Sequence, residues 1–308
     1  MEKILITGGS GLLGGNLAMM AREKFEVYAT YYRHPIKIKN CVTLAMDIRN
    51  RRETFRAVSR IRPELIVHTA ALTDVDYCEE HPNEAYSLNV EGTRNLAMAA
   101  ESVGAKFIYI STDSVFDGKK GMYTEEDLPN PLNCYAKTKL EGERILGEFD
   151  LNYTIIRTCI YGWNMQRKFS LAEWVIDGLC NNKKRPMFTD VFFSPILVNN
   201  LAEAIFEIYE RDIQGVLNVA GSERCSKFQF GKKVAEVFSL DGSYIEPISI
   251  NDYAGFKAVR PRDVSLDISK AKKMLHTKLL NVEEGLVWMR ELLENGFVNE
   301  LKECIARY

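Results

Sequence analysis

The sequence lacks the features that mark disulfide-rich or metal-binding proteins. Its 308 residues include an odd number of cysteines and no Cys-x-x-Cys, so neither a disulfide framework nor a zinc site is indicated. None of the four histidines has a metal-ligand spacing, and we predict no protein-encoded metal site. The cysteines are scattered and are expected to be reduced thiols: Cys41, Cys78, Cys134, Cys159, Cys180, Cys225 and Cys304.

Long apolar runs and a charge of one sign are also missing. No stretch approaches the roughly 18 apolar residues of a membrane span, and no signal-like run follows Met1. The net charge of −2 gives no attraction to nucleic acid or membrane. With 46% hydrophobic residues the chain is able to bury a large core. We therefore expect a cytoplasmic protein whose partner is a small molecule.

A strand, a glycine-rich turn and a helix stand at the start of the chain. Residues 3–7 form a short apolar run, and an apolar-periodic pattern continues to about Glu23. Between them, Gly8 permits a tight turn, Gly11 allows a pyrophosphate to approach the backbone, and Gly14 allows close helix packing. The helix N-terminus would hold the anion. The pattern predicts a dinucleotide site, with a ligand-free glycine turn as the alternative.

Strand-like and helical patterns then alternate along the first half of the chain. Such alternation predicts an α/β fold, a Rossmann-type doubly wound parallel sheet with right-handed crossovers. The apolar, strand-like runs are residues 25–31, 42–45, 65–69, 106–111 and 153–157. The clearest helical patterns are residues 51–61, 84–103 and 133–149.

Beyond Gly162 the loops lengthen and the rhythm changes. We predict an NAD(P)-binding domain over residues 1–162, to which residues 196–220 return with one more strand. Residues 163–195 and 221–308 would form a smaller C-terminal substrate-binding domain. This part should cover the sheet edge at which ligands bind.

Tyr135 and Lys139 lie four residues apart, on one face of a helix that opens near Asn133. The positive charge of a lysine favours the phenolate, so we expect Lys139 to lower the pKa of Tyr135 toward working pH. Thr112 follows the strand-like run 106–111, where a hydroxyl can face a substrate carbonyl. Ordinary turn and surface residues are the alternative interpretation of each pattern taken alone.

Arg33 stands where NAD-specific sites carry an acidic residue, some twenty residues beyond the glycines. A guanidinium there could pair with the 2′-phosphate of NADP, although a surface arginine is also common at such a position. The sequence therefore predicts NADPH as the cofactor, with NADH possible.

Together these motifs resemble the extended short-chain dehydrogenase/reductase superfamily, with Thr-Gly-x-x-Gly-x-x-Gly, a strand-end Thr and Tyr-x-x-x-Lys in order. More narrowly, the chain is similar to the dTDP-4-dehydrorhamnose reductase family. The segments that carry this resemblance are residues 70–76, 89–93, 110–118, 129–135, 157–158, 194–195 and 260–267.

The resemblance implies an NADPH-dependent reductase that acts on the 4-keto group of a nucleotide-linked 6-deoxyhexulose, giving dTDP-L-rhamnose in the parent case. Tyr135 would donate a proton to the carbonyl oxygen, Thr112 would hydrogen-bond it, and Lys139 would hold the nicotinamide ribose. A homodimer is expected by analogy. The implied cofactor residues are Gly8, Ser10, Gly11, Leu12, Leu13, Gly14, Arg33, Asp47, Ile48, Ala70, Ala71, Thr73, Tyr135 and Lys139. The implied substrate residues are Val75, Val115 and Arg260.

Some positions depart from the family pattern. The family commonly reads Arg-Thr-Ser-Trp-Val-Tyr after the sixth strand, whereas Ile160 stands here at the tryptophan position, with Trp163 nearby. These changes leave two alternatives to a reductase. One is a non-catalytic NADP-binding regulatory subunit like that of methionine adenosyltransferase, and the other is a nucleotide-sugar epimerase or dehydratase.

Overall fold

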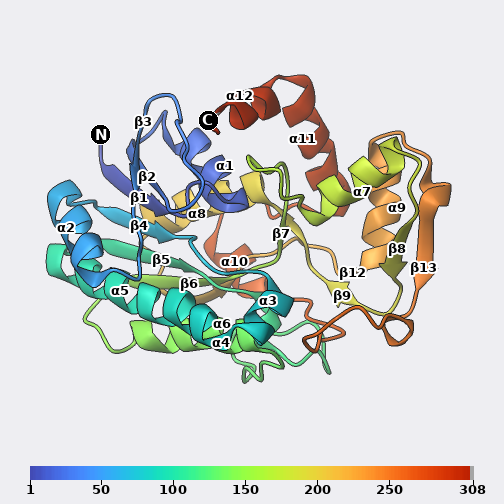
Figure 1. Cartoon of the computed structure of the whole chain (residues 1–308), viewed down its shortest axis with the longest axis horizontal. Coiled ribbons are helices and arrows are strands. Elements are labelled where there is room, and N and C mark those ends of the chain that lie inside the picture. Colours follow the sequence, from blue (N-terminus) through green and yellow to red (C-terminus); the bar gives the residue numbers. More distant parts are fainter. Residues whose placement is uncertain (306–308) are drawn as a thin grey trace.

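The structure is a computed structural model that describes residues 1–305, and its centre is a sheet of seven parallel strands (Figure 1). The strands are β1 (Lys3–Thr7), β2 (Glu26–Tyr31), β3 (Cys41–Ala45), β4 (Leu65–His68), β5 (Lys106–Ile110), β6 (Tyr153–Arg157) and β11 (Gly215–Asn218). Their spatial order is β3-β2-β1-β4-β5-β6-β11, which reverses between β1 and β4. The predicted doubly wound parallel sheet is confirmed, and ligands bind at such a reversal.

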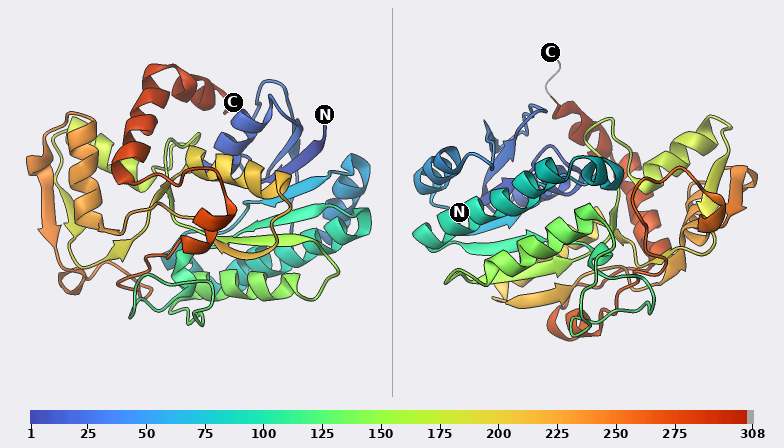
Figure 2. Two further views of the ribbon diagram at one scale, coloured as in Figure 1. Left: turned by 180° about the vertical axis from the view of Figure 1, so that it is seen from behind. Right: turned by 60° about the horizontal axis from the view of Figure 1, so that its bottom comes forward.

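Helices cover both faces of this sheet. They are α1 (Leu12–Ala21) and α8 (Val198–Glu210) on one face, and α2 (Arg51–Ile61), α5 (Gly92–Val103) and α6 (Cys134–Leu146) on the other. In β1, Ile4 and Ile6 pack with α1 and α8, whereas Leu5 packs with α2 and α5. Successive strand residues point to opposite faces, so each strand supplies both cores. The right-hand view of Figure 2 shows α5 and α6 side by side over the sheet.

A smaller part of the chain lies beyond the carboxyl ends of the strands (Figure 1). Its helices are α7 (Leu171–Cys180), α9 (Lys227–Val237) and α11 (Val282–Glu294), and α9 packs against the other two. Its short strand pairs are β7 (Ile160–Tyr161) with β10 (Ile196–Leu197), β9 (Phe192–Phe193) with β12 (Cys225–Ser226), and β8 (Arg185–Phe188) with β13 (Ile245–Ile248).

The chain passes between these two parts more than once. After the first excursion β11 returns to the edge of the main sheet beside β6. Near its end, α10 (Ser269–Met274) packs beside β11, and α12 (Phe297–Glu303) packs against α1. An ion pair of 2.6 Å between Arg22 Nη1 and Glu300 Oε1 fixes this last contact.

The helix predicted at residues 84–103 is confirmed, and it contains a π-helical turn that the sequence did not predict. The chain forms α3 (Val75–Glu80), α4 (Pro82–Tyr86) and a π-helical turn (Ser87–Glu91) before α5 begins. At the junction, a Cβ on Gly92 would lie 2.7 Å from Ile48 Cδ1, so Ile48 packs closely against the helix at this point. Such π-turns often occur at functional sites.

Two kinds of structure are absent from residues 1–305. No helix there has the length and apolar character that crossing a bilayer requires. No group of three or more His, Cys, Asp or Glu side chains is arranged to hold a metal ion in the same residues. All seven cysteines are free thiols.

Candidate active site

The turn after β1 has the shape that a dinucleotide site needs. Gly8 has φ +69°, in the left-handed region that favours glycine. A Cβ on Gly14 would lie 2.3 Å from the Gly8 carbonyl oxygen, so only glycine lets α1 approach the turn this closely. Gly11 caps α1 without a side chain, and no acidic residue stands in the first helical turn, which holds Leu12 and Leu13. The unpaired amide groups and the helix dipole favour an anion here.

The end of β4 lies directly against this turn. A Cβ on Gly8 would be 2.8 Å from the backbone of Ala70, and the Thr69 hydroxyl donates a hydrogen bond of 2.6 Å to the Thr7 carbonyl oxygen. Ala71 and Thr73 follow Ala70 in the same loop. The structure thus brings together the residues predicted for the cofactor at the ends of β1 and β4.

Asn89, in the π-helical turn, ties this loop to the helix that carries Tyr135. Its Oδ1 accepts a hydrogen bond of 2.8 Å from Leu72 N, and its Nδ2 donates to Leu72 O at 3.1 Å and to Thr138 Oγ1 at 3.0 Å. Its side chain is buried and fully engaged. Asn89 therefore holds the backbone at the junction of the β4 loop and α6.

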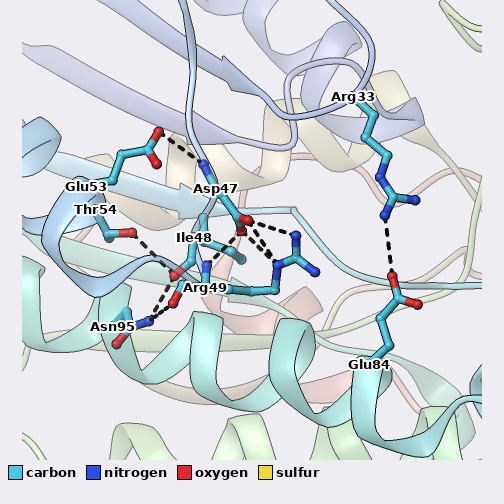
Figure 3. A network of polar contacts seen from close by, with 8 residues as sticks. All are labelled: Arg33, Asp47, Ile48, Arg49, Glu53, Thr54, Glu84 and Asn95. Carbon is cyan, nitrogen blue, oxygen red and sulfur yellow. Dashed lines mark hydrogen bonds and ion pairs between the residues drawn. The ribbon is translucent and has the colours of Figure 1, made fainter.

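Arg33 and Asp47 lie at the other end of the site, after β2 and β3 (Figure 3). The Arg33 side chain is 67% exposed and lies 3.6 Å from Glu84 in a loose ion pair, so it is free to turn toward a ligand. The Asp47 carboxylate, predicted to accept a hydrogen bond from the cofactor, is already engaged within the protein. Arg49 donates to both of its oxygens, at 2.9 Å and 2.7 Å. This guanidinium lowers the pKa of the Asp47 carboxyl.

Arg49 was missed by sequence reasoning. Its guanidinium lies 5.0 Å from the centre of the Tyr32 ring, and that of Arg33 lies 5.5 Å from the same ring. Beside them, Asn95 Nδ2 donates a hydrogen bond of 3.0 Å to the carbonyl oxygen of Ile48, which fixes the backbone next to Asp47 (Figure 3). The spacing in the sequence could have indicated this contact, since the side chain of an arginine two residues after an aspartate can reach its carboxylate.

Thr112 and Tyr135 meet at the carboxyl end of β5. Thr112 follows β5, while Tyr135 lies in the first turn of α6, whose N-cap Asn133 accepts a hydrogen bond of 2.9 Å from Ala136 N. The Thr112 hydroxyl lies close enough to the Tyr135 phenol to influence its pKa. The Thr112 hydroxyl also donates to Asp113 Oδ1 at 3.1 Å, which orients it within the site.

The acidity of this pair differs from the expectation. Burial raises the pKa of Tyr135, and the Thr112 hydroxyl opposes that shift only in part. Lys139 is buried with its amino group 3.9 Å from the centre of the Tyr109 ring, and burial lowers the pKa of Lys139 to about 7. The prediction that Lys139 lowers the pKa of Tyr135 is therefore wrong for the chain as it stands, because the lysine is itself desolvated. Tyr135 stays protonated and able to donate.

A buried ion pair supports this site from one helical turn away. Glu143 Oε2 accepts a hydrogen bond of 2.7 Å from Arg157 Nη2, and its Oε1 accepts from the Ser111 hydroxyl. Ser111 directly precedes Thr112, and the Glu143 carboxylate opposes the fall in the pKa of Lys139. Sequence reasoning missed Glu143, although it stands four residues after Lys139 on the same helix face.

The predicted substrate residues lie in different surroundings. Arg260 pairs with Asp76 at 3.0 Å beside the start of α3, where Val75 is located. The neighbouring Val259 carbonyl accepts a hydrogen bond of 3.0 Å from Asn133 Nδ2, which brings this loop to the start of α6. Val115 is fully buried in the core, so its side chain packs inside the protein.

The aromatic platform of the family pattern is not restored by Trp163. Its ring is buried, and Nε1 donates a hydrogen bond of 2.7 Å to the Met289 carbonyl oxygen on α11. Trp163 therefore belongs to the core between α11 and the segment after β7. Ile160, at the tryptophan position, lies in β7.

Comparison with known proteins agrees with this geometry. Residues 1–294 match the family model described as the RmlD substrate binding domain. The chain belongs to the RmlD family. The family assignment therefore covers both the sheet with its glycine turn and the smaller part that packs beside the strand ends.

Individual members of the family differ in name. A dTDP-4-dehydrorhamnose reductase from Sinorhizobium fredii is 31% identical over 93% of this chain and 97% of its own length. Methionine adenosyltransferase 2 subunit beta from Bos taurus is 32% identical over 89% of this chain and 82% of its length. The structure of a dTDP-4-dehydrorhamnose reductase from Bacillus anthracis in complex with NADP superposes with a TM-score of 0.85. It is 29% identical and covers 94% of this chain and 99% of its own.

Proposed function

We propose that the protein is an NADPH-dependent reductase of the dTDP-4-dehydrorhamnose reductase type, which reduces the 4-keto group of a nucleotide-linked 6-deoxyhexulose. The observation that carries this proposal is the placement of the buried Thr112 hydroxyl beside a protonated Tyr135 at the carboxyl end of β5. The reductase from Sinorhizobium fredii, similar over almost its whole length, supports it.

The residues fit a dinucleotide cofactor. Gly8, in the left-handed region, and Gly14, whose Cβ would meet the Gly8 carbonyl oxygen, give the tight turn and the close helix approach of a pyrophosphate site, and Arg33 is exposed and only loosely paired. Asp47 and Ile48 would border the adenine, and Lys139 would hold the nicotinamide ribose. When bound, the reduced nicotinamide supplies the hydride. The NADP complex of the relative from Bacillus anthracis supports NADPH, with NADH as a weaker alternative.

The protein's own groups would manage the proton and the charge. Reduction of a ketone builds negative charge on its oxygen, and a hydroxyl that donates to that oxygen stabilises the transition state. Tyr135 would give its proton to this oxygen, and Thr112 would turn its hydroxyl from Asp113 to the same atom. The raised pKa of Tyr135 keeps the proton available for donation.

The substrate would lie between the sheet and the smaller part of the chain. We propose residues 1–162 and 196–220 as the cofactor domain and residues 163–195 and 221–308 as the substrate domain, although α12 packs back onto α1. Arg260 would leave Asp76 to neutralise a diphosphate, while Val75 and the backbone of Val115 would border the sugar. We further propose a homodimer located in the cytoplasm, with no nucleic acid or membrane partner.

A second candidate function is a cofactor-binding subunit of another enzyme. The similarity to methionine adenosyltransferase 2 subunit beta over 89% of this chain favours it. Such a subunit has no use for a proton donor, whereas the Thr112 and Tyr135 pair is complete here. The two functions therefore differ in whether Tyr135 matters for turnover.

The test is the rate of NADPH consumption with dTDP-4-dehydrorhamnose for the wild type and for Tyr135→Phe. We expect the variant to lose about a hundredfold or more in turnover, since it lacks the proton donor, with NADPH affinity within a few fold of the wild type. Tyr244→Phe, a tyrosine outside the site, is the control and should keep full activity. Normal turnover by Tyr135→Phe contradicts the mechanism, and tight NADPH binding without turnover favours the subunit function.

A further inference from the structure

A segment of the smaller part reaches across the glycine turn. Residues 163–169 connect β7 to α7, and in Figure 1 this segment approaches α1. Gln166 Nε2 donates a hydrogen bond of 2.6 Å to the Ser10 carbonyl oxygen, in the middle of the glycine turn. Beside it, Met165 Cε would be 2.8 Å from a Cβ on Gly15. The segment is therefore packed closely on the loop that we assign to the cofactor.

The same segment also reaches the loop after β4. Lys168 Nζ donates a hydrogen bond of 3.4 Å to Thr73 Oγ1. Ser10 and Thr73 belong to the two loops that lie together through Gly8 and Ala70. Residues 166–168, here called the strap, thus connect the two loops at the point where the sheet order reverses.

The strap is held in a defined shape by its own residues. Asn164 Oδ1 accepts a hydrogen bond of 3.1 Å from Gln166 N, and Asn164 Nδ2 donates to the Lys168 carbonyl oxygen at 2.7 Å. The Glu173 carboxylate on α7 accepts from Asn164 N at 3.1 Å and from Ser170 N at 2.9 Å. These hydrogen bonds fix the backbone on both sides of the strap, so its position is defined by the fold.

The charge of the strap is not balanced by nearby acids. Arg167 and Lys168 are exposed, and neither forms an ion pair within residues 1–305. Both follow Gln166, which contacts the turn that precedes α1. A lysine whose ammonium meets only a neutral hydroxyl is available to form a charge-assisted hydrogen bond with a phosphate, and such bonds are about twice as strong as neutral ones.

We propose that the strap is a phosphate clamp, in which Gln166 and Lys168 hold the pyrophosphate of the dinucleotide from the side opposite the glycine turn. This inference rests on the proposed function, because it requires a bound dinucleotide. Binding would exchange the contact of Lys168 with Thr73 for one with a phosphate oxygen. The substrate domain would then sense whether the cofactor is present.

Dissociation constants for NADPH and NADH, measured by nucleotide fluorescence, test the clamp without requiring turnover. Lys168→Met should weaken both dinucleotides by the same factor of about ten, the loss of one charge-assisted hydrogen bond. Lys168→Arg should restore most of the affinity. Lys183→Met, which removes an exposed lysine beyond α7, is the matched control and should change neither constant.

The equal loss of affinity for both dinucleotides distinguishes the clamp from a contact with the 2′-phosphate. If Lys168 bound the 2′-phosphate, its replacement would weaken NADPH alone. Unchanged affinity of Lys168→Met, in a wild type that binds NADPH, overturns the clamp and leaves the proposed function standing. A wild type that binds neither dinucleotide overturns both. Weakening by Lys168→Arg equal to that by Lys168→Met also overturns the clamp, since the charge is then irrelevant.

Discussion

Replacing Glu143 by Gln should destabilise the protein strongly. The Arg157 and Glu143 side chains are each 5% exposed, and Arg157 Nη1 has no hydrogen-bond partner even in the intact pair. Removing one partner of a buried pair costs about 3–5 kcal/mol, because the other charge stays buried without compensation. That cost is a large fraction of the roughly 5–15 kcal/mol that a folded protein has in total.

The assay is urea unfolding followed by fluorescence or circular dichroism. For a slope of about 3 kcal/mol per molar urea, Glu143→Gln should lower the midpoint by about 1 M or more. The control is Glu148→Gln, which breaks the exposed pair with Arg94 and should shift the midpoint far less, because solvent screens that pair. If both variants shift the midpoint equally, the reasoning about burial is refuted.

Three further predictions concern the cofactor site and its lysine. Arg33→Ala should weaken NADPH more than NADH, and an unchanged preference in fluorescence titration would rule out the phosphate assignment. Gly14→Ala should abolish NADPH binding because its Cβ would meet the Gly8 carbonyl oxygen at 2.3 Å, whereas Gly147→Ala, with only an ordinary contact at 3.4 Å, should bind normally. Burial lowers the pKa of Lys139 from 10.5 to about 7, so between these values the unfolded chain holds a proton that the folded chain lacks. The free energy of unfolding should therefore rise with pH across that window, by up to about 1.4 kcal/mol per unit from this group, and denaturation of Lys139→Met should show a flatter rise.

Local patterns predicted much of the fold and the site. The glycine turn, the strand ends and the spacing of Tyr135 and Lys139 depend on residues close in the sequence. The pKa of Lys139 did not follow from spacing, because it depends on burial of this α6 residue against Tyr109, which lies thirty residues earlier on β5. Desolvation is a property of the packed core rather than of a motif.

Contacts between distant segments were the other part that the sequence did not reveal. Gln166 reaches Ser10 over a separation of 156 residues, and no local pattern indicates that pairing. The π-helical turn before α5 was likewise not indicated by any local pattern. Arg49 and Glu143 had local signals, since each lies within four residues of a predicted site residue.

The most direct test of the account is transfer of hydrogen from the cofactor to the sugar. NADPH that carries deuterium at both hydrogen positions of nicotinamide C4 is mixed with the protein and dTDP-4-dehydrorhamnose, and the mass of the sugar nucleotide is measured by mass spectrometry. We expect one deuterium in the wild-type product and almost none with Tyr135→Phe. An unlabelled sugar from a wild type that binds NADPH tightly would contradict the assignment of the protein as this reductase.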